Sequence, residues 1–128
     1  VFDVKKKLFG GYEIFTHNAK NKVKQDFLGL IEIVQQLGAG EIVINSIDND
    51  GVMKGYDTDL IEKVKSRLKI PLTVLGGAGD LKDIGQAIEK FGLMGCAAGS
   101  LFVFKGKYKA VLINYPDQMI KNRLFDNK

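Results

Sequence analysis

The sequence predicts an α/β fold with a parallel sheet, within a single domain of 128 residues. Short β-branched runs alternate with longer amphipathic segments in the order strand, helix, strand, helix, strand, helix. The expected strands start at residues 41, 71 and 95, a spacing that right-handed βαβ units require. Fifteen glycines against two prolines is unusual, and several of the glycines directly follow apolar runs.

The first half of the chain supplies one clear strand and two helices. Asp26 to Leu37 carries apolar residues at helical spacing and ends at Gly38. Glu41 to Ser46 is a short β-branched run typical of a buried strand. After a polar stretch, Asp57 is a good N-cap for a second helix whose apolar stripe runs to Leu68.

The second half repeats this pattern. Pro71 to Leu75 predicts a strand with its proline at the entrance, and a helix follows the N-cap Asp80. Gly95 to Gly99 predicts a small-residue strand, and Ser100 to Phe104 a short helical turn. Because these strands are apolar at consecutive positions, we expect a parallel sheet that is covered on both faces.

The two ends are less regular. Val1 to Asp3 resembles the end of a strand already under way, so we expect the chain to be a fragment or one module of something larger. Tyr12 to His17 predicts a short extended arm. Tyr108 to Asn114 predicts a final short helix, and the polar stretch 117–128 a frayed tail.

Composition excludes several classes of protein. Hydrophobic residues make up 45% and charged residues 27%, as in a globular domain rather than a disordered or fibrous chain. No apolar run is long enough to span a bilayer. The net charge of +4 suits anionic ligands, but the lysines are spread and no arginine-rich or stacking patch predicts nucleic-acid binding. The absence of a leader and the single Cys96 favour the cytoplasm.

Nothing in the residue pattern predicts a metal or a cofactor. Cys96 lies in a small-residue strand and is expected to be a packed, inert thiol. No Cys/His cluster has zinc spacing. The loop containing Asp48 and Asp50 departs from the EF-hand pattern, because Val52 stands at the fifth position and the glycine comes early.

Two glycine turns are candidate phosphate-binding loops. In parallel α/β sheets, ligands bind beyond the carboxyl ends of the strands. Gly76 to Gly79 joins a strand to a capped helix, so its backbone N–H groups can face a phosphate. The alternative is a tight turn with no ligand. Gly99 and Ser100 follow the next strand, and Ser100 is either a phosphate ligand or a helix cap.

Carboxylates lie at the same edge of the predicted sheet. Asp48 and Asp50 follow a strand and serve either in acid/base chemistry or in turn formation. Asp3 stands at a strand end, where a catalytic carboxylate would stand, although Asp is common there in any case. Together, these carboxylates and the glycine turns predict a site that holds a phosphate near carboxylates.

The motifs resemble a known family as a set. Residues 38–51 (GAGEIVINSIDNDG), 55–57 (GYD), 76–79 (GGAG) and 98–100 (AGS) closely resemble the C-terminal half of the cyclase subunit of imidazole glycerol phosphate synthase. That family is a (βα)8 barrel with two similar halves, and the resemblance runs from residue 1 to about residue 104. It implies a (βα)4 half of a TIM-type barrel that carries the fifth to eighth strands.

The resemblance also implies roles for individual residues. The family's cyclase takes ammonia from a glutaminase partner and closes the imidazole ring of a phosphorylated nucleotide. Asp3 matches the catalytic aspartate at the end of strand 5, and Asp50 matches a further active-site aspartate. The positions that match phosphate-binding or substrate-facing loops are Gly76, Gly77, Gly99, Ser100, Thr16 and Asn18. The matching strands 1 to 4, with the other aspartate and the second phosphate site, are absent.

Alternative functions remain open at this point. The stretch Tyr108 to Pro116 resembles a paralogous branch linked to surface polysaccharides, in which the cyclase-like protein and its glutaminase help to amidate a sugar. A half barrel that binds phosphate without turnover is a third reading. A receiver domain fits poorly, because no acidic cluster accompanies Asp3. Two open sheet edges and an exposed apolar inner face predict a homo-oligomer.

Overall fold

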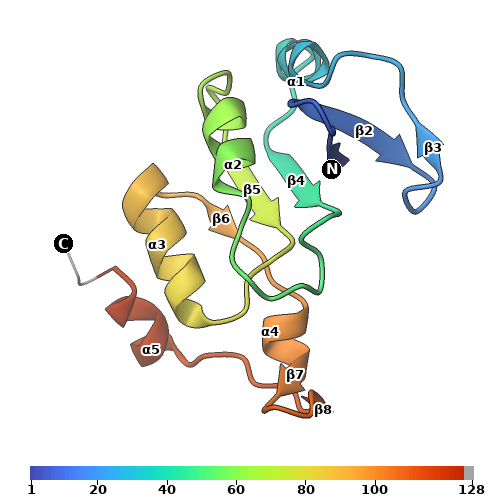
Figure 1. Ribbon diagram of the computed structural model, residues 1–128. Coiled ribbons are helices and arrows are strands. Elements are labelled where there is room, and N and C mark those ends of the chain that lie inside the picture. The colour runs from blue at the N-terminus through green and yellow to red at the C-terminus, as the bar shows by residue number, and fades with distance from the viewer. Residues whose placement is uncertain (126–128) are drawn as a thin grey trace.

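A computed structural model describes residues 1–125, which form an α/β structure around a six-stranded mixed sheet. The strands of this sheet lie in the order β3-β2-β1-β4-β5-β6, and a separate two-stranded sheet pairs β7 with β8 (Figure 1). The strands are β1 (Phe2–Lys6), β2 (Tyr12–Thr16), β3 (Asn21–Lys22), β4 (Ile42–Ser46), β5 (Leu72–Leu75), β6 (Gly95–Cys96), β7 (Phe104–Lys105) and β8 (Ala110–Val111). The helices are α1 (Phe27–Gln36), α2 (Thr58–Lys65), α3 (Leu81–Phe91), α4 (Ser100–Val103) and α5 (Gln118–Arg123).

The βαβ core follows the sequence prediction closely. Strands β1, β4, β5 and β6 are parallel neighbours, and α1, α2 and α3 connect them in turn. Each of these helices starts at an aspartate cap, and two of the caps, Asp57 and Asp80, were predicted. Asp26, Asp57 and Asp80 each accept a backbone N–H from the first turn. The caps fix where each helix begins, because they satisfy N–H groups that have no partner within the helix.

The expectation of a wholly parallel sheet is wrong on the β1 side. After β1 the chain reverses through Gly10 and Gly11, which adopt φ values of 89° and 81°. The N–H of Lys7 donates to the Gly11 carbonyl at 3.0 Å and closes this turn. A tight reversal returns the chain beside β1, so the predicted extended arm is β2, which pairs antiparallel with β1. The outer edge of β1 is therefore not open, contrary to expectation.

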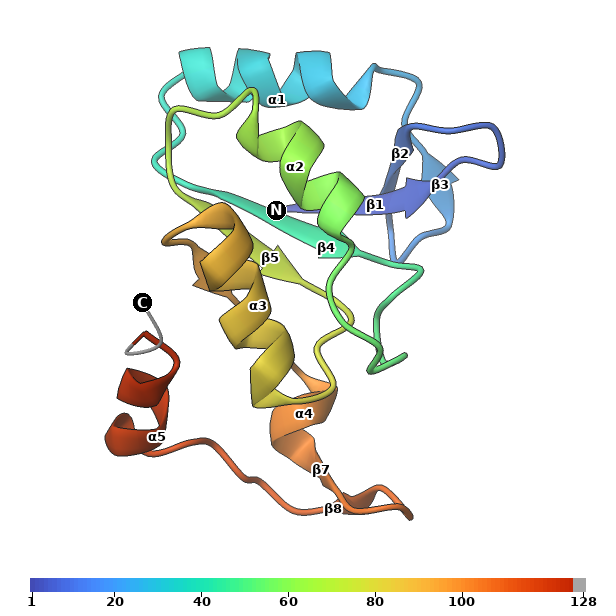
Figure 2. The ribbon, with the colours of Figure 1, turned by 60° about the vertical axis from the view of Figure 1, so that its left-hand side comes forward.

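Helices cover one face of the sheet. In Figure 2, α2 and α3 lie in front of the strands, and α1 runs along the top of the sheet. Burial alternates along each long strand, as in the pattern buried, half-buried, buried, half-buried, buried of β4. Ile42, Ile44 and Val74 point toward the helices and join the core. The prediction that both faces are covered is therefore wrong.

The helix-free face is more polar than predicted. The expectation was an exposed surface of Ile, Val and Leu. The strand positions that alternate with the buried ones instead include Asp3, Asn45 and Thr73 beside Val43 and Leu75. The β-branched isoleucines all face the helices, so carboxylate and amide groups are left on the face that no helix covers.

The C-terminal segment also differs from its prediction. The expected helix from Tyr108 to Asn114 is a β-hairpin, because Lys109 donates to the Gly106 carbonyl and both residues adopt positive φ. β7 and β8 pair antiparallel across this turn. The expected frayed tail contains α5, which Asp117 caps at the Ile120 N–H. Part of that tail prediction, residues 126–128, lies outside the described residues.

Candidate functional site

The carboxyl ends of the parallel strands bring the predicted site residues to one edge of the sheet. In the strand registers, Asp3 of β1 lies beside Asn45 of β4, and Asn45 lies beside Leu75 of β5. Gly76 follows Leu75 directly, so its turn starts at the level of Asp3. The sheet therefore places the carboxylate and the first glycine turn at the same end, as the sequence predicted.

Asp3 is held by an amide that the sequence analysis missed. The Asn45 Nδ2 group donates to Asp3 Oδ1 at 3.0 Å. Among the described residues, Asn45 Oδ1 is buried and has no hydrogen-bond partner. A buried amide oxygen without a partner is uncommon, and it lies at the Asp3 end of β4. The available signal was a polar residue inside an apolar strand, one position before the strand ends.

The loop that carries Asp50 passes beside Ser100. Gly51, next to Asp50, has a φ of 71°, and a Cβ built on it would lie 3.9 Å from the Ser100 hydroxyl oxygen. The β4–α2 loop therefore passes directly beside the N-terminus of α4. The Asp50 residue is exposed. The roles predicted for Asp50 and for the turn at Gly99 and Ser100 stay predictions.

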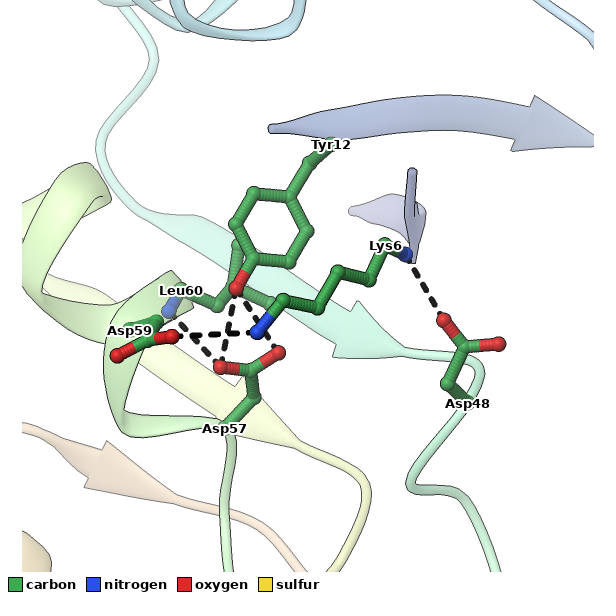
Figure 3. A network of polar contacts seen from close by, with 6 residues as sticks. All are labelled: Lys6, Tyr12, Asp48, Asp57, Asp59 and Leu60. Atoms are coloured by element: carbon green, nitrogen blue, oxygen red, sulfur yellow. Dashed lines mark hydrogen bonds and ion pairs between the residues drawn. The ribbon is translucent and has the colours of Figure 1, made fainter. Parts of the chain in front are cut away.

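Asp48 has a different surrounding from Asp50. Its Oδ2 atom accepts the backbone N–H of Lys6 at 2.8 Å, and its Oδ1 atom lies 3.9 Å from Lys5 Nζ. β1 extends past the end of β4 at Ser46. The carboxylate therefore supplies an acceptor where the β4 ladder has stopped. It ties the loop that carries Asp50 to the strand that carries Asp3, as Figure 3 shows for its bond to Lys6.

A second group of contacts fastens the β1–β2 hairpin to α2 (Figure 3). The Tyr12 hydroxyl donates to the Asp57 carboxylate at 3.0 Å, and Lys6 Nζ donates to Asp59 at 3.1 Å. Burial and the Asp57 hydrogen bond raise the pKa of Tyr12, so this phenol stays protonated and keeps donating. The ion pair with Lys6 lowers the pKa of Asp59. Asp57 therefore serves both as helix cap and as anchor for the hairpin.

The turn at Gly76 and Gly77 is packed tightly against neighbouring backbone. A Cβ on Gly76 would lie 2.5 Å from the Ser46 carbonyl oxygen, and one on Gly77 would overlap the Gly55 carbonyl. Both glycines are buried and have positive φ. Their close approach accounts for two of the glycines on structural grounds alone. The N–H of Gly79 donates to Asp83 Oδ2 at 2.8 Å and is therefore already paired within the protein.

The turn at Gly99 and Ser100 has more open surroundings. Gly99 is exposed, and a Cβ on it would meet no atom within 4 Å. It occupies the N-cap position of α4, and no side chain caps that helix. N–H groups in a first helical turn lack partners within the helix. The N–H groups of Phe102 and Val103 donate to the Gly99 carbonyl, so the backbone donors left beside the Ser100 hydroxyl are those at the very start of α4. The helix-cap alternative for the Ser100 side chain has no hydrogen bond to support it.

Thr16 and Asn18 lie on the β2–β3 hairpin. Phe15 is the partner of Asp3 across the β1–β2 ladder, so Thr16 lies one position away from that pair. The Thr16 hydroxyl donates to the Asn21 carbonyl at 3.4 Å within its own turn. Asn18 adopts a φ of 57° in the same turn. Their predicted contact with substrate remains a prediction.

Cys96 lies in β6, where it pairs with Val74 of β5. Burial raises the pKa of Cys96 to about 11, which keeps the thiol protonated at neutral pH. Within residues 1–125, no group of three or more His, Cys, Asp or Glu side chains is placed to hold a metal ion. None of the helices described is long and apolar enough to cross a membrane.

The comparison with known proteins agrees with this arrangement. The family model described as histidine biosynthesis protein matches residues 2–109. A Vibrio vulnificus protein named "Putative imidazole glycerol phosphate synthase subunit hisF3" is 55% identical over 97% of this chain and 48% of its own length. The hisF2 protein of Pseudomonas aeruginosa, also named putative, is 43% identical over 90% of this chain and 46% of its own length. Imidazole glycerol phosphate synthase subunit HisF of Chlorobaculum parvum is 35% identical over 78% of this chain and 40% of its own length.

These relatives are about twice as long as the matched region, and the chain spans about half the length of the curated relatives it matches. The family model covers most of the chain, including β1, β4, β5 and β6 with their following loops. The chain therefore belongs to the histidine biosynthesis protein family and is a HisF-type homologue of the cyclase subunit of imidazole glycerol phosphate synthase.

Proposed function

We propose that this chain supplies the fifth to eighth strands of a HisF-type barrel that makes imidazole glycerol phosphate. The reaction joins ammonia to a phosphoribulosyl aminoimidazole-carboxamide nucleotide and releases imidazole glycerol phosphate and the carboxamide ribotide. The single observation that carries the proposal is the register of Asp3, Asn45 and Leu75, which puts a carboxylate beside the Gly76 turn. The HisF-type relatives support the same assignment.

In this proposal Asp3 transfers protons during ring closure. Its carboxylate lies on the helix-free face, which corresponds to the interior of a barrel, and Asn45 fixes one of its oxygens. The other oxygen is left to face the substrate. Asp50 lies on the adjacent loop and provides a second carboxylate near Ser100. A complete acid/base pair also needs the aspartate that the family carries on strand 1, which the other half of the barrel supplies.

One substrate phosphate lies between the two turns. The backbone of Gly77, the Ser100 hydroxyl and the first N–H groups of α4 are the donors for this phosphate. The Gly99 surroundings leave room for it. The proposed partners are a glutaminase subunit that supplies ammonia and the chain segment that completes the barrel. A second copy of this chain is the alternative way to cover the helix-free face.

The test is ammonia-dependent cyclisation by this chain alone and mixed with a separately expressed N-terminal half of a HisF relative. We expect turnover on mixing, and its loss in Asp3→Asn. Glu89→Gln, an exposed carboxylate on α3, is the matched control and should leave turnover unchanged. Phosphate binding without turnover under both conditions would instead support a non-catalytic half barrel.

A second candidate function is ammonia transfer to a sugar in surface-polysaccharide synthesis. The observation that favours it is a difference in similarity: four relatives whose names are marked as putative are 43% to 55% identical, whereas four named simply HisF are 35% to 40% identical. Complementation separates the two. Growth of a histidine auxotroph lacking HisF, when given the full-length protein, supports the histidine pathway, and failure with retained phosphate binding supports the sugar.

A further inference from the structure

The C-terminal segment Phe104–Phe125, here called the basic segment, carries the charge imbalance of the molecule. It contains five basic residues and one acidic residue, Asp117, so its net charge of +4 equals that of the whole chain. The basic residues are Lys105, Lys107, Lys109, Lys121 and Arg123. The remainder of the chain is electrically balanced, so the net positive charge is concentrated on β7, the turn between β7 and β8, and α5.

The same segment exposes large apolar side chains. Half of the exposed large apolar residues in the described chain belong to it. Tyr108 is 90% exposed, Ile113 is 80% exposed and Val111 is 76% exposed. Both views show the β7–β8 hairpin projecting from the body of the molecule (Figures 1 and 2). Apolar residues gathered in this way beside charged ones are typical of an interaction surface.

The hairpin also offers unpaired backbone. Its two strands are two residues long each, and in the described chain no third strand pairs with them. The chain continues alongside through a bond from the Leu112 N–H to the Val103 carbonyl. An isolated two-stranded hairpin is only marginally stable in water. A partner that covers it would supply both apolar contact and backbone hydrogen bonds.

The charge, the exposed apolar side chains and the unpaired backbone of the basic segment indicate which kind of partner it binds. A bilayer is disfavoured, because hydrocarbon cannot satisfy the free backbone groups at the strand edges. A nucleic acid is disfavoured because the β7–β8 hairpin has lysines without arginine and a single exposed aromatic ring, that of Tyr108. A second copy in a twofold contact would place two surfaces of charge +4 against each other. An acidic protein surface fits both the charge and the apolar groups.

The family model matches only the first part of the basic segment. The family model ends at Lys109, whereas the Vibrio vulnificus relative is matched over 97% of the chain. The Chlorobaculum parvum HisF is matched over 78%. The part of the basic segment after Lys109 therefore lies beyond the match to the family model, whereas Lys105, Lys107 and Lys109 lie within it.

We infer that the basic segment is the docking surface for a partner protein that presents apolar side chains ringed by carboxylates. Lys105, Lys107 and Lys109 pair with the acidic rim, and Val111 and Ile113 pack against its apolar centre. The inference is independent of the reaction, because none of these residues belongs to the proposed catalytic site. It assigns the segment to recognition rather than to turnover.

The test measures binding of a labelled nine-residue strand peptide, in which glutamate alternates with valine, by fluorescence anisotropy. We expect saturable binding that weakens by at least about tenfold when salt shortens the Debye length from roughly 10 Å to 3 Å. The triple variant Lys105→Glu, Lys107→Glu, Lys109→Glu should lose binding. The matched triple variant Lys20→Glu, Lys24→Glu, Lys69→Glu changes the net charge equally and should retain it.

Two further arms complete the experiment. Val111→Ser with Ile113→Ser keeps every charge and changes two exposed residues, so it should fold normally and bind the peptide less tightly. Vesicles of phosphatidylglycerol and a twelve-nucleotide single strand of DNA are offered to the same proteins. Binding to either of these in place of the peptide overturns the inference. Equal loss in both triple variants, or no binding of the peptide, overturns it as well.

Discussion

At the scale of single residues, the two aspartates of the β4–α2 loop have separate roles. Asp48 is engaged by the Lys6 N–H and by Lys5, whereas Asp50 is exposed next to the glycine that faces Ser100. The sequence left acid/base chemistry and turn formation open for both. The contacts favour a positioning role for Asp48 and leave Asp50 as the carboxylate available to a substrate.

Asp48→Ala in the full-length protein should therefore reduce kcat for ammonia-dependent turnover by about tenfold to a hundredfold, because a shift of about 1 Å in a site costs that much. Asp48→Asn keeps an oxygen acceptor for the Lys6 N–H and should recover most of the loss. If Asp48→Asn is as inactive as Asp48→Ala, the carboxylate itself takes part in the chemistry and the positioning role is wrong.

Cys96 makes the free energy of unfolding depend on pH in the alkaline range. Burial raises its pKa to about 11 in the folded protein, against about 8.5 for an unfolded cysteine. Above the unfolded pKa the unfolded chain releases this proton while the folded protein retains it. The Cys96 contribution to the free energy of unfolding is therefore complete below about pH 8.5 and declines as pH rises toward 11.

Urea unfolding at a series of pH values from roughly 7 to 10 measures this decline. Cys96→Ala should show a shallower decline than the unsubstituted protein. Native Cys96 should also react slowly with a thiol reagent at neutral pH and rapidly once unfolded. Rapid reaction of the folded protein would contradict a buried, protonated thiol.

At the scale of elements, the β1–β2 hairpin is held to α2 by Tyr12. Its side chain is 7% exposed and its hydroxyl donates to the carboxylate that caps α2. Tyr12→Phe should lower the free energy of unfolding by about 2 kcal/mol, since hydrogen bonds to charged groups contribute about that much. Tyr108→Phe, at a 90% exposed position, is the control and should change it little. A negligible effect of Tyr12→Phe would show that the hairpin is held by packing alone.

The elements also show what could be predicted from the sequence. α1, α2 and α3 were predictable because an aspartate cap precedes each apolar stripe. β2 was predicted only as an extended arm, since its pairing depends on the reversal at Gly10 and Gly11. The helix expected over Tyr108 to Asn114 failed because the positive φ values of Gly106 and Lys109 create a hairpin. In both places the structure depends on turn residues with positive φ, which the apolar pattern does not reveal.

The candidate site was predictable in part for the same reason. Asp3, Gly76 and Ser100 stand at strand ends, and parallel strands bring such positions together. Asn45 was missed because its role depends on the register between β1 and β4, which pairs it with Asp3. Sequence spacing within one segment does not contain that register.

At the scale of the whole molecule, the sheet has helices on one face (Figure 2). The other face carries polar groups, among them Asp3 and Asn45. Parallel sheets are normally covered on both faces, so the other half of the proposed barrel would cover this helix-free face. Asp3 and Asn45 point to that face at the end where the glycine turns gather. The account thus depends on one site that is assembled from β1, the β4–α2 loop and the turns after β5 and β6.

The most direct measurement is a titration of the isotopically labelled chain with imidazole glycerol phosphate, followed by the amide signals in NMR spectra. The account predicts that the backbone signals of Gly77 and Ser100 and the side-chain amide signal of Asn45 shift together, along one binding curve, and that Ser100→Ala weakens that curve. Shifts confined to residues elsewhere, or separate curves for the two turns, would contradict a single site at this edge of the sheet.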